Sequence, residues 1–143
     1  MMHIPVNHQL RQLYRVVAGL TGLYAIVFGV LGFVASRDLA MFARSDVPWV
    51  LGLRANPAFA LLSIVAGAVV VLATVIGRNA DYVVNQTIGS VFLLVGLAML
   101  TLLETDANIL AFSMTNCIGV FVTGLLIGTA GLYAKVETSG RAA

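Results

Sequence analysis

Charged residues are scarce in this chain. They make up 10% of the sequence, and apolar residues make up 60%, whereas a soluble domain carries about 25% charged residues. Because so few charges cannot cover a water-facing surface, we expect lipid to be the solvent for most of the protein. The formal net charge is only +2, and no block of Lys and Arg is present, which excludes the usual electrostatic basis of nucleic-acid binding.

Cysteine and catalytic motifs are nearly absent. The single cysteine, Cys117, excludes an internal disulfide and a zinc site built from cysteine alone. The chain has no P-loop, no H-E-x-x-H and no G-x-S-x-G motif. Its one acidic pair, Glu104 and Asp106, falls in a short turn, where solvated loop carboxylates are expected. We therefore expect no enzymatic activity, no catalytic or metal-binding residues and no cofactor.

Four long stretches contain no charged residue. They lie between Arg15 and Arg37, Arg54 and Arg78, Asp81 and Glu104, and Asp106 and Lys135. Each is long enough, at about 1.5 Å per residue, to cross the roughly 30 Å hydrocarbon layer as a helix. The sequence thus predicts an all-α, polytopic membrane protein. We expect a four-helix transmembrane bundle of two helical hairpins (helices 16–35, 56–77, 82–103 and 108–134), with a polar N-terminal arm (1–15) and a polar C-terminal tail (135–143).

The first stretch has an alternative interpretation as a cleaved signal peptide, because Arg11 and Arg15 precede it and small residues follow. It is longer than the 7 to 15 residues of a usual signal-peptide core, so we favour a retained helix. The distribution of Lys and Arg favours both termini in the cytoplasm. We expect a multi-pass membrane protein.

Residues 36–55 form the only long connection, and they mix apolar with charged side chains. This mixture suits a segment in the headgroup region with Trp49 as an interfacial anchor. The alternative is a partly ordered loop resting on the helix ends. The next helix has a clear start signal, because Asn56 precedes Pro57 as an N-cap precedes a proline at the first helical position. Asn79 or Asp81 could cap the third helix, and Asp106 or Asn108 the fourth.

Small residues recur along the predicted helices at spacings that place them on one face. Lipid tails are as apolar as leucine, so helices associate in membranes through close backbone approach and interhelical hydrogen bonds. The amide of Asn116 is too polar for lipid and needs a partner inside the bundle or in a neighbouring subunit. The candidate helix-packing or partner-contact residues are Gly22, Gly29, Ser63, Gly67, Gly89, Gly96, Asn116, Gly119, Gly124 and Gly128.

The two halves of the chain are weakly alike. Residues 29–33 near the end of the first helix resemble residues 96–100 of the third, and the start of the second helix at 55–59 resembles residues 107–112. A repeat of hairpins that each cross the membrane twice would be parallel. The alternative is chance similarity between apolar helices.

Three segments together resemble an actinobacterial family of four-helix integral membrane proteins of unknown function. They are Gly29-Val30-Leu31-Gly32-Phe33, Leu51-Gly52-Leu53-Arg54-Ala55-Asn56-Pro57 and Asp106-Ala107-Asn108-Ile109-Leu110. The resemblance implies a bacterial inner-membrane location and brings no assigned activity. Members usually have histidines three and seven residues after the asparagine of the Asn-Pro pair, where this chain has Phe59 and Ser63. A histidine-dependent role in relatives would therefore not carry over.

Proton-coupled carriers usually need an ionisable group within the membrane, and the predicted spans contain no charged residue. Our first hypothesis is a non-catalytic accessory subunit that packs against a larger membrane complex, with an Mce-type envelope lipid transporter as the kind of partner that the resemblance suggests. The reason for this hypothesis is that the predicted helices carry more small-residue faces than four short helices need to pack against one another. The alternative is a self-contained protein that binds membrane lipid or another hydrophobic ligand, including as a homo-oligomer.

Overall fold

A computed structural model describes residues 9–136 of the chain. The four helices are α1 (Arg11–Ser36), α2 (Pro57–Ile76), α3 (Ala80–Leu102) and α4 (Met114–Leu132), and each is long and apolar enough to cross a membrane. Two short strands, β1 (Trp49–Val50) and β2 (Leu53–Arg54), lie between α1 and α2. The expected multi-pass helical bundle is thereby confirmed.

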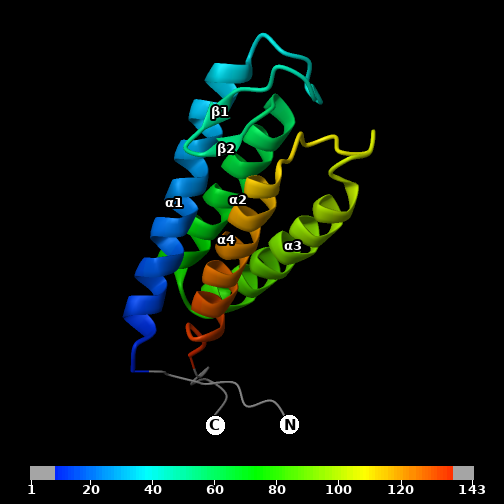
Figure 1. The fold of residues 1–143 in the computed structure, drawn as a ribbon. Helices are drawn as coiled ribbons and strands as arrows, with labels where there is room; N and C mark the ends of the chain where they lie inside the picture. Colours follow the sequence, from blue (N-terminus) through cyan, green and yellow to red (C-terminus); the bar gives the residue numbers. More distant parts are fainter. Residues whose placement is uncertain (1–8, 137–143) are drawn as a thin grey trace.

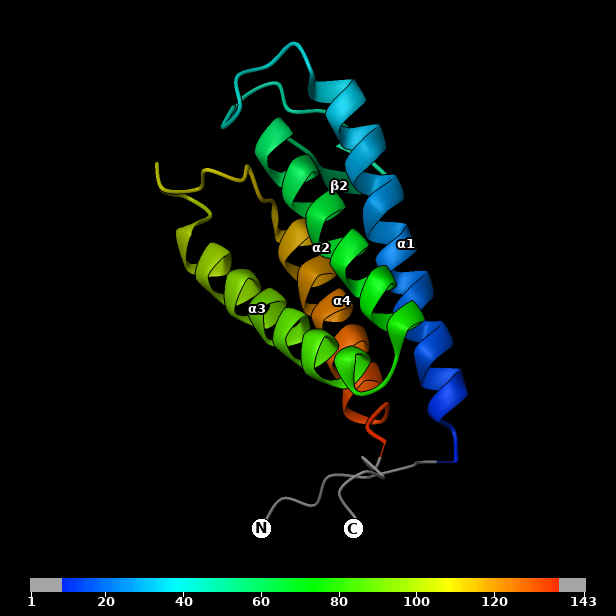
Figure 2. The same cartoon turned by 180° about the vertical axis from the view of Figure 1, so that it is seen from behind.

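The helices pack as two hairpins. α1 lies along α2, and α3 lies along α4, with less contact between the pairs. α1 begins, and α4 ends, at the end of the bundle where a tight turn joins α2 to α3 (Figure 1). Both longer connections lie at the other end, toward which α3 leans away from the remaining helices (Figures 1 and 2). We call these the turn end and the loop end.

Close backbone contact holds each hairpin together. A Cβ added to Gly29 of α1 would lie 2.6 Å from the carbonyl oxygen of Ala60 on α2. In the second hairpin, a Cβ on Gly89 would lie 2.6 Å from the Cα of Gly128. Because no real Cβ fits at such distances, the hairpins depend on glycine at these positions, as helix pairs in membranes commonly do.

The helix boundaries differ from the prediction at two places. α1 begins at Arg11, so the expected N-terminal arm of residues 1–15 ends earlier, and α4 begins at Met114 instead of residue 108. Asn108 does not cap α4, because its Oδ1 accepts from the backbone N–H of Phe112 and its Nδ2 donates to the carbonyl of Phe112. Ala111 then has φ of 56°, outside the helical region, and the Ser113 hydroxyl caps α4 instead.

The predicted caps of the other helices have mixed outcomes. Asn56 caps α2 as expected, since its side chain accepts from the Phe59 N–H and Pro57 occupies the first helical position. Asn79 precedes α3 without a side-chain cap bond and instead pairs with the backbone of Val136. Asp106 is exposed and pairs with Arg44 at 3.2 Å. Of the expected C-terminal tail, residues 137–143 lie outside the described part of the chain.

Ser36, the first residue of the expected connection 36–55, ends α1, and residues 37–55 contain turns and an antiparallel β-hairpin and no helix. Trp49 pairs with Arg54, and Val50 with Leu53, around a turn in which Leu51 and Gly52 both have positive φ. Positive φ at both central residues gives the turn type that matches strand twist. The Trp49 side chain is 59% exposed; its role as an interfacial anchor stays a prediction.

Candidate functional site: an apolar cavity between the hairpins

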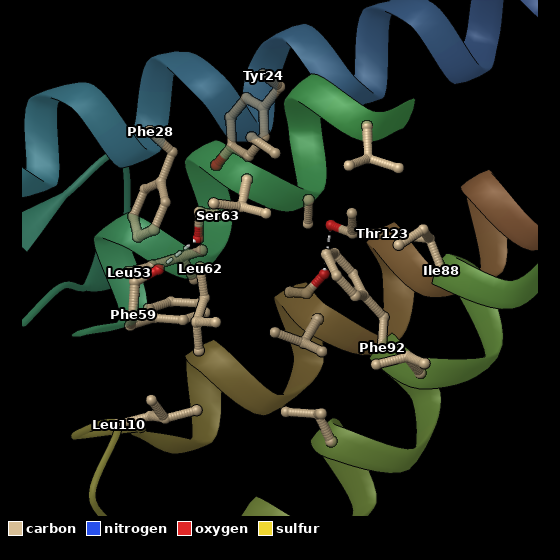
Figure 3. Close-up of a pocket in the computed structure, with 18 residues that line it drawn as sticks. Tyr24, Phe28, Leu53, Phe59, Leu62, Ser63, Ile88, Phe92, Leu110 and Thr123 are labelled. Carbon is tan, nitrogen blue, oxygen red and sulfur yellow. Dashed lines mark hydrogen bonds between the residues drawn. The ribbon is translucent and has the colours of Figure 1, made fainter. Parts of the chain in front are cut away.

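A cavity of about 250 Å³ lies between the two hairpins and receives side chains from all four helices (Figure 3). Its inner wall is aromatic, with Phe28 of α1 and Phe59 of α2 in edge contact at 5.4 Å between ring centres. Lining residues with exposed side chains, such as Leu62 and Val65 of α2 and Val91 of α3, show that the cavity is open toward the lipid-facing surface. An apolar molecule in the bilayer can therefore reach it from the side.

Among the described residues, the cavity wall carries no charge, and its polar side chains are Tyr24, Ser63 and Thr123. The Ser63 hydroxyl donates to the carbonyl of Phe59 at 2.9 Å, and the Thr123 hydroxyl donates to the carbonyl of Gly119 at 2.7 Å. Both hydroxyls are thus bonded to their own helices, as the dashed lines in Figure 3 show. The interior can accept apolar groups without stripping water from a charge.

Polar side chains join the hairpins at the turn end. Asp81 of α3 is fully buried, and its Oδ2 lies 3.3 Å from Arg11 Nη2 and 3.4 Å from Arg15 Nε. Arg11 also donates to the carbonyl of Ala134 beyond α4, and Arg15 donates to the carbonyl of Thr74 on α2. This ion network therefore connects α1, α2, α3 and the segment that follows α4.

Two buried asparagines join the hairpins at the loop end. Asn116 of α4 donates to the carbonyl of Arg54 at 2.8 Å and accepts from its N–H at 2.9 Å, so one amide pairs with the edge of β2. Asn56 donates to the carbonyls of Ala43 and Ile109, one in each long connection. With polar links at both ends, the cavity occupies the apolar middle of the bundle.

The sequence-predicted packing residues all lie within this framework. Gly22, Gly29 and Gly67 form the contact between α1 and α2, and Gly89, Gly96, Gly124 and Gly128 form that between α3 and α4. Gly119 faces Leu53 of β2, with a Cβ position 3.1 Å from its Cδ2. Ser63 and Gly119 also line the cavity, whereas Asn116 serves the loop-end link.

Sequence reasoning missed the ion network and the cavity. Asp81 marked the boundary of a predicted span, and the structure places it inside α3 as a buried side chain. Arg11 and Arg15 are four residues apart, a spacing that puts both on one helix face and that could have signalled a shared partner. No groups of three or more potential metal ligands occur among the described residues.

Comparisons of the chain with family models, with curated proteins and with solved structures find no match.

Proposed function

We propose that this protein is a self-contained membrane protein that binds the apolar part of a lipid between its two hairpins. The cavity of about 250 Å³ carries the proposal, because its wall is apolar and it opens toward the lipid-facing surface. An engineered apolar protein cavity of about 150 Å³ binds benzene, and complete small-molecule sites occupy about 300 to 1,000 Å³. The cavity volume therefore suits one segment of a lipid, with the rest of the molecule in the bilayer.

The absence of charge from the cavity wall supports an uncharged ligand segment. A charged headgroup inside this cavity would lack a counter-charge in a medium of low dielectric constant. Two of the three wall hydroxyls, those of Ser63 and Thr123, already donate to backbone carbonyls. Binding here requires apolar contact and no chemical step.

The accessory-subunit hypothesis rested on a different observation, namely small-residue faces that were expected to remain free to contact a partner protein. The glycines that suggested it contact other segments of the same chain, and three of them, Gly29, Gly67 and Gly89, have no room for a Cβ. Because the bundle itself uses these faces, the lipid-binding function is the better supported of the two proposals. An Mce-type transporter as partner stays a prediction, and it is an alternative outcome of the experiment below.

The test is lipid retention by the full chain, measured by native mass spectrometry after purification in gentle detergent. Ala66 lines the cavity on α2, so Ala66→Phe should fill it and remove the bound lipid. The matched control is Leu72→Phe on the same helix, where the side chain is 61% exposed and lies outside the cavity lining. Equal lipid retention by the two variants would contradict the proposal. Loss of a co-purifying protein instead of a lipid would favour the accessory role.

We also propose that the turn end faces the cytoplasm of a bacterial inner membrane. Four basic residues lie at that end, namely Arg11, Arg15, Arg78 and Lys135. Short cytoplasmic loops of membrane proteins carry more Lys and Arg than the loops on the opposite side. Ser45→Cys, in the exposed part of the loop end, should react with an impermeant maleimide in intact cells. Cys117 is fully buried and serves as the unlabelled background. Labelling of Ser45→Cys only after permeabilisation would contradict this orientation and indicate the opposite one.

A further inference from the structure

Tyr24 lies near the middle of α1, a helix long and apolar enough to cross a membrane, and so far from either expected interface. On α1 it follows Arg15 by nine residues and precedes Arg37 by thirteen. These separations correspond to about 14 Å and about 20 Å along the helix axis. Tyrosines in membrane proteins concentrate at the two interfaces, where the hydroxyl reaches water. The position of Tyr24 therefore calls for another explanation.

Among the described side chains of the cavity wall, only Tyr24 has a polar group that makes no hydrogen bond; its side chain is 43% exposed, so it borders both the cavity and the lipid-facing surface. Figure 3 shows the ring reaching from α1 toward the side of the cavity where Ser63 lies. Across residues 9–136, no hydrogen bond engages this hydroxyl, whereas those of Ser63 and Thr123 donate to their own helices. A hydroxyl without a partner is unfavourable in hydrocarbon, and a phenylalanine would fill the same space without that penalty. A ligand with a hydrogen-bond acceptor would complete the site.

We infer that the ligand is a neutral lipid with a carbonyl oxygen, to which Tyr24 donates a hydrogen bond at the membrane midplane. The inference rests on the proposed lipid-binding function and narrows its ligand class. A phospholipid fits poorly, because its ester oxygens stay with the charged headgroup at the edge of the hydrocarbon layer, about 14 Å or more from Tyr24 along α1. The uncharged cavity wall gives a phospholipid headgroup no counter-charge at this depth.

Two kinds of neutral lipid carry such an oxygen, namely long-chain quinones and fatty esters. The aromatic part of the wall, with Phe28, Phe59 and Phe92, could contact a flat quinone ring through ring faces and edges. A fatty ester would place its chains along the aliphatic wall that α2 and α3 contribute. Both present the same acceptor to Tyr24, so the experiment must separate them.

The test compares wild type with Tyr24→Phe, both as the full chain in lipid nanodiscs. The probes are a long-chain naphthoquinone, a wax-type fatty ester and a straight alkane of matched length without a carbonyl. One hydrogen bond predicts that Tyr24→Phe weakens binding of the preferred carbonyl probe about two- to tenfold. Alkane affinity should be unchanged. Tyr82→Phe is the control, because Tyr82 lies against Lys135, 5.0 Å from its ring centre, and not in the cavity lining.

The outcomes separate this inference from the function on which it rests. Equal affinity of wild type and Tyr24→Phe for both carbonyl probes, with the alkane still bound, would overturn the role of Tyr24 and leave the lipid-binding cavity intact. Failure of wild type to bind any probe, the alkane included, would overturn both. A Tyr24-dependent preference for the naphthoquinone or for the ester identifies which of the two lipid classes the cavity selects.

Discussion

Gly22 of α1 and Gly67 of α2 face each other so closely that the backbone of each occupies the place of a side chain on the other. A Cβ on Gly67 would lie 2.5 Å from the Gly22 carbonyl oxygen, and one on Gly22 would lie 3.1 Å from that of Gly67. Gly89 and Gly124 repeat the relationship between α3 and α4, at 2.8 Å and 3.0 Å. Gly22 and Gly89 are counterparts in the predicted repeat, but Gly67 and Gly124 are not, because the match of residues 55–59 with 107–112 pairs Gly67 with residue 119 or 120. The internal repeat stays a prediction. These glycine contacts hold the two helices of each hairpin close together beside the cavity.

Gly29→Ala should destabilise the first hairpin. The new methyl would lie 2.5 Å from Ile64 Cγ1 and 2.6 Å from the Ala60 carbonyl oxygen, so the helices must separate. Overpacking of this kind typically costs about 1 to 3 kcal/mol. The measurement is thermal unfolding in detergent, followed with a fluorogenic maleimide that reacts when the buried Cys117 becomes accessible. Gly19→Ala is the control, because its methyl would meet only Thr74 Cγ2 at an ordinary 3.8 Å. Equal melting temperatures of the two variants would contradict this account of the contact.

Gly89 and Gly128 should respond differently to alanine, although they touch each other. A Cβ on Gly89 would lie 2.6 Å from the Gly128 Cα, whereas one on Gly128 would lie 3.8 Å from the Gly89 Cα. We expect Gly89→Ala to lose about 1 to 3 kcal/mol. Gly128→Ala should be neutral or slightly stabilising, because alanine is the better helix former. Thermal unfolding followed by the reactivity of Cys117 compares the two variants. A larger loss of stability for Gly128→Ala than for Gly89→Ala would show that this description of the α3–α4 contact is wrong.

The four spans could be predicted from the sequence because charges mark their limits. Arg15, Arg37, Arg54 and Arg78 lie at or just beyond the ends of apolar stretches, and a helix is the only single segment that satisfies its own backbone in lipid. The start of α4 could not be placed in this way. Asn108 was expected to begin the helix, yet its amide bonds the local backbone instead, and apolar content alone does not distinguish these two uses of one side chain.

The candidate site was much less predictable than the fold. Asp81 is 70 residues from Arg11 in the chain, and no local pattern indicates which of several boundary charges meet after folding. The cavity is a space left where hairpins diverge, so it depends on packing between distant helices. Tyr24 illustrates the difference, because only the placement of its helix beside the cavity distinguishes it from an ordinary lipid-facing residue.

Asp81→Asn should weaken the turn end of the bundle. The substitution leaves the guanidinium groups of Arg11 and Arg15, with side chains only 17% and 22% exposed, without their shared carboxylate. Removing one partner from a buried ion network costs about 3 to 5 kcal/mol. Thermal unfolding should report a clear decrease in melting temperature. Asp106→Asn is the control: its carboxylate pairs with Arg44 in a fully exposed position, so no measurable change is expected. Comparable melting of both variants would exclude a structural role for the ion network.

Asn116→Ala should loosen the β-hairpin at the loop end without unfolding the helices. The substitution leaves both the N–H and the carbonyl of Arg54 without the amide that pairs with them. Each of these partly buried backbone groups then lacks a hydrogen-bond partner, which is expected to cost about 1 to 3 kcal/mol. The loss of stability falls on β2. Hydrogen exchange followed by mass spectrometry should show faster exchange in residues 49–54 and unchanged exchange in the centre of α2. Thr115→Ala, at the exposed neighbouring position, should leave exchange at the β-hairpin unaltered. If Asn116→Ala exchanged at the wild-type rate there, the side-chain pairing with Arg54 would not be what holds β2 against α4.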